Sequence, residues 1–516
     1  MQRKENKNSA SLRVLSNTGI LYAKVLITMG ISLYSTRLVL DYLGESDFGI
    51  FNLIAGIVAM LLFINAAMAT SVQRYLSFHK GTDNFEMQRK VFTNSWILHI
   101  VIGLIIVTLL IALSSILFNV FLNIPADRIS SAKKVYCFML MSVFFTIISV
   151  PFTAALNARE NMFWVAIVLI IESILKLIIA LSLSHFSQGE RLIWYSLFTT
   201  GISICSFFMY ALYCVNRYEE CNIKTYKIDI LLLKELSGYS GWIIAGTFAW
   251  TGRIQGMGVI LNFFFGTLVN AAYGIAQQVA GMLGFFSASL LRAFDPQIMK
   301  SEGMNDRKRM LRLSMMECKF CFFLISFIAI PFIFEMPAIL TFWLRNVPDN
   351  AVIFCQLILV STMSNQLTIG IKTAIHSTGR IKLYQILDSI AIFLSVPIAY
   401  FLFKQGFPAY WAFLVIVCTD ILAALFRLLV LRRITEFSIL EFGKRVIIKE
   451  IIPISTSILT CWLITNHFVF DYRFIATTVF SIAVFSISIY FTGMCKDERE
   501  IIDKGIKGVL AKYWKR

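Results

Sequence analysis

The stretch YLGESDFGIFNLIAGIVAML at residues 42–61 is echoed by FFGTLVNAAYGIAQQVAGML at residues 264–283. In these stretches Gly49 and Gly274 each follow an aromatic residue and precede an isoleucine. Each stretch also comes after an apolar span of similar length. A long-range echo of this kind indicates an internal duplication with both copies in the same orientation.

The regions around the two stretches are too apolar for a soluble protein. Of the 516 residues, 58% are hydrophobic and 15% charged, and the mean hydropathy is +0.74. Runs of about 20 apolar residues can cross a bilayer, and only helices or closed barrels satisfy every backbone group there. Barrel strands would show short alternating patterns. The sequence therefore predicts an all-α membrane protein with about fourteen transmembrane helices, centred in 17–41, 48–76, 94–121, 135–157, 163–184, 192–215, 238–262, 268–291, 313–335, 351–374, 385–403, 411–431, 451–467 and 474–492.

The duplication divides these spans into two pseudo-symmetric bundles of six, with two further helices at the end. The division predicts an N-lobe at 1–222, a C-lobe at 223–433, two added spans at 434–492 and a tail at 493–516. The tail has an apolar face and a largely basic one, which is typical of a helix lying in the headgroup region.

The distribution of Lys and Arg predicts the orientation. With the N-terminus inside, the cytoplasmic segments hold 33 of these residues and the opposite loops hold 7. This asymmetry places both termini in the cytoplasm. The net charge of +17 is then mainly a topology signal, and it indicates anionic lipid headgroups as partners and no nucleic acid.

Features of an enzyme or a metalloprotein are missing from the sequence. The outer loops are short, and no nucleophile motif, paired carboxylates or phosphate-binding glycine loop occurs. Cys318 and Cys321 have CxxC spacing without a second pair or a histidine cluster. We therefore expect no catalysis, no metal and no cofactor.

Ionisable residues inside the spans are the candidate functional residues, because each costs roughly 2.5–3.5 kcal/mol when it faces lipid near the bilayer centre. Those that lie deep must face a partner or an aqueous cavity. Cations outnumber anions among them, which favours an anionic substrate over a cationic drug. The set comprises Lys24, Arg37, Arg74, Glu172, Lys176, Arg253, Glu317, Lys319, Asp388, Asp420 and Arg427.

Four cations are candidates for binding an anion. Lys24 shares a polar helical stripe with Thr28. Arg37 lies off that stripe and either faces the cavity or reaches the outer headgroups. Arg74, near the inner end of its span, either faces the cavity or reaches the inner headgroups. Arg253 shares a face with Trp250, which adds a stacking surface.

The remaining candidates could line a cavity or couple transport to an ion. Glu172 and Lys176, four residues apart, could instead neutralise each other. Trp250, Gln277 and Asp388 complete the set. Glu317 and Lys319 are expected near the membrane interface, and Asp420 and Arg427, on one helical face, are expected to be structural.

Several segments resemble the Wzx-type polysaccharide flippases of the multidrug/oligosaccharidyl-lipid/polysaccharide exporter superfamily. The resemblance extends over essentially the whole chain and depends on the order and spacing of the segments. They are RLVLDYLGESDFGIFNL at 37–53, AILTFWLRNVPDNAVIFCQLILV at 338–360, AIHSTGRIKLYQI at 374–386, PIAYFLFKQGFPAY at 397–410 and ERE at 498–500.

The resemblance implies two six-helix bundles around a central cavity that opens alternately to the two faces. It also implies a bacterial inner-membrane flippase for undecaprenyl-pyrophosphate-linked oligosaccharide repeat units, working for surface polysaccharide synthesis beside assembly proteins such as a polymerase. Arginines of comparable spans in relatives hold the pyrophosphate. The alternatives are a cation-coupled multidrug extruder of the same superfamily, an integral-membrane enzyme of glycan assembly and a scaffold without transport. The sequence names no coupling ion.

Overall fold

The computed structural model is all-helical where it is described. It describes residues 27–28, 30–32, 34–35, 38–39, 41–44, 47–48, 50–51, 54–55, 62–118, 128–222, 228–344 and 347–500. Short turns connect the helices, and these ranges contain no strand. The predicted all-α membrane class is confirmed.

The helices agree with the expected spans. Over the described ranges, ten helices are long and apolar enough to cross a membrane, or eleven if one bent pair is a single span. The first two expected spans lie partly outside the described residues, and the seventh is the first half of a longer helix, α7 (Ile230–Gly303). About fourteen spans therefore fit the structure.

The chain divides into two compact units, each described here by itself. The N-unit comprises Ser16–Ile244 with Gly303–Asn305, and the C-unit includes Ala245–Glu302 and Asp306–Arg516. The division falls inside α7, whereas the sequence suggested a lobe boundary at 222/223. The basic tail beyond residue 500 lies outside the described residues.

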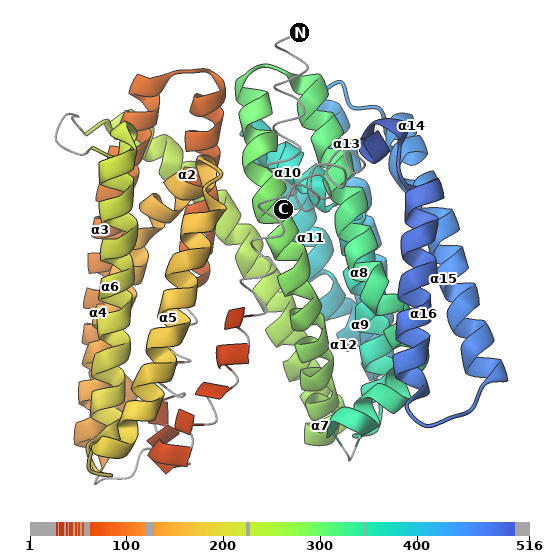
Figure 1. The fold of residues 1–516 in the computed structure, drawn as a ribbon, viewed down its shortest axis with the longest axis horizontal. Coiled ribbons are helices and arrows are strands. Elements are labelled where there is room, and N and C mark those ends of the chain that lie inside the picture. Colours follow the sequence, from red (N-terminus) through yellow and green to blue (C-terminus); the bar gives the residue numbers. More distant parts are fainter. Residues whose placement is uncertain are drawn as a thin grey trace, which may run out of the picture. The chain divides into compact units, whose positions relative to one another are not determined.

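The N-unit is built around α4, which packs against α2, α3 and α6. Its core contains Val39 and Ile54 from the first helices together with Tyr136 and Ile147 of α4. Apolar side chains on the outer face of α3 are exposed, as expected for contact with lipid. The helices are α2 (Leu62–Gly81), α3 (Phe85–Ile116), α4 (Ile129–Ala158), α5 (Met162–Ser182) and α6 (Arg191–Arg217), with the first part of α7 (Figure 1).

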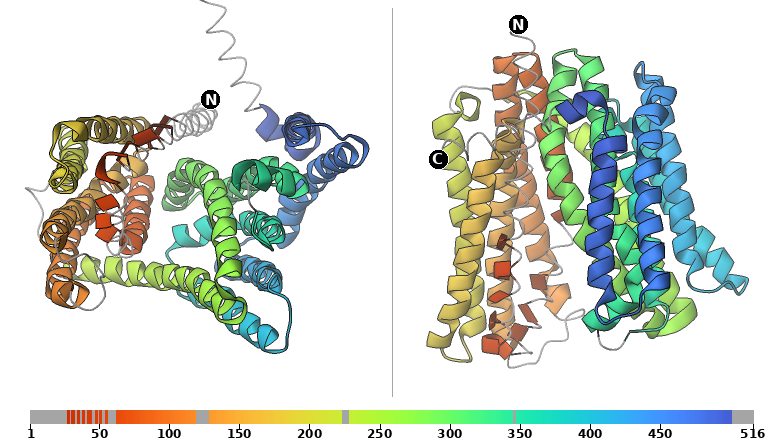
Figure 2. Two further views of the ribbon diagram at one scale, coloured as in Figure 1. Left: turned by 90° about the horizontal axis from the view of Figure 1, so that it is seen from below. Right: turned by 45° about the vertical axis from the view of Figure 1, so that its right-hand side comes forward.

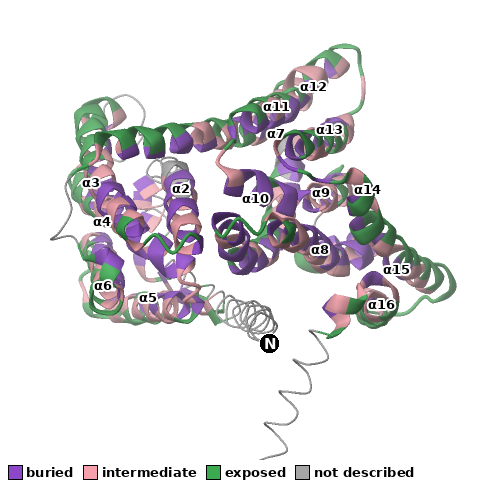
Figure 3. Ribbon diagram, turned by 90° about the horizontal axis from the view of Figure 1, so that it is seen from above, coloured by how far each residue is buried: buried purple, intermediate pink, exposed green. Residues whose placement is uncertain are grey.

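The C-unit contains the rest of α7 and all later helices. Here α8 contacts α9, α10, α15 and α16, while α13 contacts α9, α10, α11 and α12. Figure 3 shows that α10 is mostly buried, whereas α15 and α16 present many exposed residues. The helices are α8 (Arg307–Leu344), α9 (Ala351–Gln366), α10 (Ile369–Thr378), α11 (Lys382–Phe393), α12 (Ser395–Lys404), α13 (Trp411–Ile434), α14 (Ile439–Phe442), α15 (Ile448–His467) and α16 (Arg473–Ser488).

Two glycines with positive φ lie near the start of the two echoed stretches. Gly44 and Gly266 are each the third residue of their stretch, and their φ angles are 77° and 80°. Positive φ costs little for glycine and more for other residues. Each glycine lets the chain turn between two consecutive spans of its unit, which supports the internal duplication.

One expected span is broken. The sequence suggested a single helix over 351–374, but α9 and α10 are bent by 40° at a break that contains Thr368. Neither glycine nor proline occupies the break, so no sequence signal marked it. Because of the bend, α10 packs against α8 in a direction different from that of α9.

The two added helices, α15 and α16, are tied to α8 by buried charges (Figure 2, blue). Glu335 of α8 accepts hydrogen bonds from Arg473 Nε at 2.8 Å and from Arg473 Nη2 at 3.1 Å. Lys319 of α8 pairs with Glu498 at 2.5 Å. This ammonium group is 1% exposed and compensated inside the unit, and the position expected for Lys319 near the membrane interface stays a prediction.

Candidate functional site

A cavity of about 390 Å³ lies within the C-unit. It is bordered by both halves of α7 and by α9 and α13. Most of its wall is apolar or small, as at Ile254, Ala280 and Ile416. Its volume lies in the range of roughly 300–1,000 Å³ that is usual for small-molecule pockets. The main polar and aromatic side chains of the wall are Trp250, Arg253, Tyr273, Gln277, Ser361 and Asn365.

Helical periodicity explains why these side chains face one space. Trp250 and Arg253 are separated by three residues, and Tyr273 and Gln277 by four, so each pair lies on one face of its half of α7. Gly266 separates the two halves, which lets both faces border the cavity.

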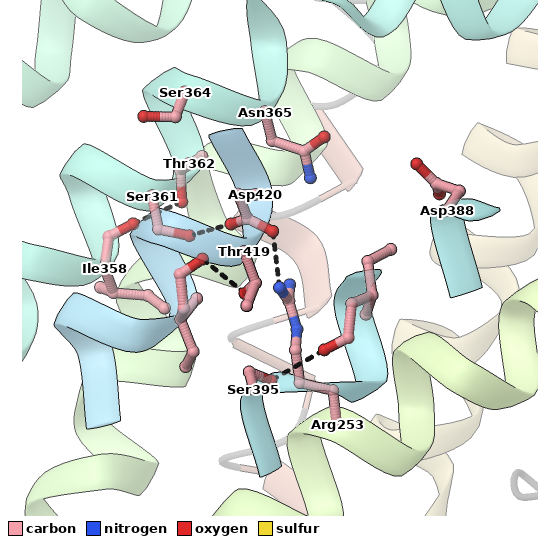
Figure 4. A network of polar contacts seen from close by, with 12 residues as sticks. Arg253, Ile358, Ser361, Thr362, Ser364, Asn365, Asp388, Ser395, Thr419 and Asp420 are labelled. Carbon is pink, nitrogen blue, oxygen red and sulfur yellow. Dashed lines mark hydrogen bonds and ion pairs between the residues drawn. The ribbon is translucent and has the colours of Figure 1, made fainter. Parts of the chain in front are cut away.

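Arg253 is held at the cavity wall by a buried ion pair. Its Nη1 donates to Asp420 Oδ1 at 2.6 Å, and the two side chains are 5% and 2% exposed. Asp420 Oδ2 accepts a second hydrogen bond from Ser361 at 2.5 Å (Figure 4). The guanidinium carbon lies 4.3 Å from the ring centroid of Trp250. Both carboxylate oxygens of Asp420 therefore have a partner, and the charge of Arg253 is compensated, as burial of charge requires.

A second ion pair lies next to the first. Arg427 Nε donates to Asp388 Oδ1 at 2.8 Å, and Arg427 Nη1 donates to Asn365 at 2.7 Å. Tyr384 donates to Asp388 at 3.2 Å. Asp420 and Arg427 are seven residues apart on α13, which places both on one face of that helix. Helix α13 thus supplies the acid Asp420, which pairs with Arg253 of α7. It also supplies the base Arg427, which pairs with Asp388 of α11.

These pairs leave the described cavity wall without net charge. The sequence reasoning counted Arg253 as a cation available to an anion, but Asp420 already compensates it. Arg427 is compensated by Asp388 in the same way. The preference for anions inferred from the charge count therefore has no counterpart in this cavity.

Three candidates from the sequence meet at the cavity, namely Trp250, Arg253 and Gln277. Asp388 is buried behind it and connects to the wall only through Arg427 and Asn365. Its role in coupling stays a prediction.

The other candidates belong to the N-unit. Arg74 of α2 is buried, 7% exposed, with its guanidinium carbon 4.5 Å from the ring of Tyr75 and 5.3 Å from that of Tyr239. It is enclosed by aromatic rings. Lys24 and Arg37 lie outside the described residues. Their predicted roles, like that of Arg74, remain predictions.

Glu172 and Lys176 lie on α5 of the N-unit. Glu172 is half-buried and Lys176 is exposed. Both belong to the described part of the chain, and no ion pair joins them there, although their spacing suggested mutual neutralisation. A role of either residue in a cavity or in coupling stays a prediction.

Sequence reasoning missed the residues that complete the site. Ser361 and Asn365 lie one turn apart on α9 and reach the two ion pairs on α13. The shared face of Asp420 and Arg427 was visible from their spacing, but their partners on other helices depend on packing. Over the described ranges, no group of three or more His, Cys, Asp or Glu residues could hold a metal ion.

Two sequence comparisons bear on the family. The model of the MatE family matches residues 21–181, which is less than half of the chain. No curated protein matches the sequence.

Solved structures show the fold more completely. A MATE structure in the straight conformation is similar with a TM-score of 0.72 at 12% identity, covering 84% of this chain and 97% of that one. The bent conformation gives 0.72 at 14% identity, covering 85% and 98%. The Vibrio cholerae MATE transporter VcmN in the bent form gives 0.69 at 13% identity, covering 82% and 97%. The chain therefore has the fold of the MATE transporters.

Proposed function

We propose that this chain is a membrane exporter that moves an amphiphilic organic molecule outward by alternating access, as a cation-coupled drug extruder does. The proposal is supported by the MATE fold, by the MatE match and by the cavity of the C-unit. The cavity is the observation on which the proposal mainly rests. Its volume of about 390 Å³ suits a drug-sized molecule, and its wall has no net charge. An enzymatic role has no support in the fold or in the site.

The chemistry of the wall suggests how such a molecule is held. The Trp250 ring, fixed against Arg253, offers a flat surface for an aromatic or apolar group. Gln277 and Asn365 offer amide donors and acceptors that suit many polar substituents. A few polar groups on an apolar wall tolerate varied substrates better than a fixed charge does.

The test is efflux of amphiphilic fluorescent dyes from cells that lack their own extruders. Removing the Trp250 ring should lose about 1–2 kcal/mol of stacking and contact, and thus roughly tenfold in apparent affinity. Trp250→Ala should therefore raise dye accumulation. Trp462→Ala is the matched control, since Trp462 lies exposed on α15. Normal efflux by the Trp250 variant, or no efflux by the unmodified protein for any dye, would contradict the proposal.

A second candidate is the flippase for lipid-linked oligosaccharides, which the sequence resemblance favours. Its supporting observation is Arg74, a cation buried in the N-unit among aromatic rings, in a region where the sequence also places Lys24 and Arg37. Such a set of cations would suit a pyrophosphate. The substrate would be an undecaprenyl-pyrophosphate oligosaccharide, and a polymerase would be the next protein to act.

Deleting the gene separates the two candidates. A flippase predicts repeat units that accumulate on the cytoplasmic leaflet and a loss of surface polysaccharide, with unchanged drug sensitivity. An extruder predicts normal surface glycan and higher drug accumulation. Under either candidate the protein would reside in the bacterial cytoplasmic membrane with both termini inside, which reporter fusions at each end can test.

A further inference from the structure

Two carboxyl groups lie together away from the cavity, where α7, α8 and α10 meet inside the C-unit. Thr373 Oγ1 of α10 donates to Asp295 Oδ1 of α7 at 3.0 Å. Glu317 of α8 is 0% exposed and interacts with both Asp295 and Thr373. The position near the membrane interface that the sequence suggested for Glu317 stays a prediction.

Gly370 explains how α10 comes so close to this carboxyl group. A Cβ atom built on Gly370 would lie 2.2 Å from the Ser314 carbonyl oxygen and 3.0 Å from Glu317 Oε2. Any larger residue would push α10 away from α8. Glu317 is therefore packed against backbone, without space for a cationic side chain on that side.

Glu317 lacks the hydrogen bonds that a buried carboxylate needs. Neither of its oxygens has a hydrogen-bond partner of normal geometry. Glu335 on the same helix is equally buried, yet it accepts from Arg473 and from Thr477 at 2.8 Å. The two glutamates are therefore equally buried, but only Glu335 is paired with a positive charge. An uncompensated buried carboxylate is strongly disfavoured, whereas a protonated one is not.

The nearby charges do not balance the pair. Lys372 and Arg292 act on Asp295, and Lys372 is also close to Arg427 and Asp388. Glu317 also acts electrostatically on the thiols of Cys318 and Cys321, which offer no positive charge. Glu317 is buried and Asp295 is half-buried, and two carboxyl groups this close do not both carry a negative charge at neutral pH.

We propose that Asp295 and Glu317 form a proton-binding site in which Glu317 carries the proton in the closed C-unit. The bend before α10 makes the site sensitive to conformation, because movement of α10 would separate Thr373 from Asp295 and Gly370 from Glu317. Solvation of Glu317 would then release the proton. The site itself is independent of the proposed function, but its use in coupling rests on the exporter activity.

Infrared spectroscopy of the purified full-length protein at neutral pH tests the site. A protonated carboxyl group absorbs separately from carboxylates, so Glu317→Gln should remove a carboxylic acid band. The matched variant Glu335→Gln should keep that band, because Glu335 is ionised against Arg473. Glu317→Gln should also unfold at nearly the temperature of the unmodified protein, since a neutral amide replaces a neutral acid, while Glu335→Gln should unfold earlier. An unchanged band in Glu317→Gln would overturn the proposal.

Transport measured in vesicles tests the coupling separately. An imposed proton gradient should increase the rate of dye export by the unmodified protein. In Glu317→Gln this increase should be at least tenfold smaller, while dye exchange without a gradient persists. If the band is lost but no substrate is transported by any variant, the proton site stands and the exporter function fails. If sodium alone drives export and Glu317→Gln leaves that drive intact, the coupling role is overturned.

Discussion

The buried pair Arg253–Asp420 allows a quantitative prediction about stability. The side chains are 5% and 2% exposed, their atoms are 2.6 Å apart, and Ser361 completes the carboxylate. Removing one partner of such a pair costs about 3–5 kcal/mol, because the other charge stays buried without compensation. We therefore expect Asp420→Ala to destabilise the protein by about 3–5 kcal/mol.

The double variant should recover most of that loss. Replacing Arg253 by Met and Asp420 by Leu removes both charges at similar volume, which is often close to neutral for stability. The single variants Arg253→Met and Asp420→Leu complete the cycle. The double variant should lose much less than the sum of the two single losses, so the coupling energy should reach at least the upper end of the roughly 0.5–3 kcal/mol found for directly contacting residues.

The assay can use the cysteines of the protein itself. Cys318, Cys321 and Cys355 are buried in the C-unit and become reactive to a fluorescent maleimide only when it opens. Denaturant titration in detergent with this readout gives the change in unfolding free energy. Substitution of Asp388 by Ala offers a matched comparison, since its pair with Arg427 is buried to a similar degree. A coupling energy below about 0.5 kcal/mol would refute the reasoning, because the pair would then be solvated.

Two backbone positions give further predictions. Gly370→Ala should destabilise the protein by about 1–3 kcal/mol or more through overpacking, since the new Cβ would lie 2.2 Å from the Ser314 carbonyl oxygen. Thermal unfolding measures this loss, and an unchanged unfolding midpoint would contradict the close approach of α10 to α8. Gly266→Ala should cost about 1–3 kcal/mol, because φ is 80° and ψ is −172°, a backbone conformation that is essentially restricted to glycine. No atom lies within 4 Å of the added methyl group, so this cost comes from the backbone alone. Gly274→Ala, at a glycine that also has open space but no positive φ, should be nearly neutral under the same measurement.

Sequence patterns predicted the fold because they depend on local properties. The apolar runs required lipid and helices, and the echo around Gly49 and Gly274 indicated a repeat. The turns at Gly44 and Gly266 became visible only in the structure. The break between α9 and α10 escaped prediction because Thr368 carries no local signal for it. Helix boundaries that depend on tertiary packing cannot be predicted from the hydrophobic periodicity of the sequence.

The site was predictable only on one helix at a time. The spacing of Trp250 and Arg253 placed both on one face of α7, and the structure shows that face at the cavity. The compensating Asp420 is 167 residues away, and only packing brings it within 2.6 Å. The same limitation applies to Glu317, since nothing in its neighbours along the chain shows that it lacks a cation while Glu335 has one.

The ties between α8 and the last two helices restrict how such a chain could have gained or lost them in evolution. Glu335 and Lys319 are buried within the bundle, and their opposite charges, Arg473 and Glu498, come from the added segment. An ancestor ending after α13 would have needed other residues at both positions of α8. Deleting the chain after α13 would leave Glu335 and Lys319 buried on α8 without their opposite charges, which is strongly destabilising for buried groups.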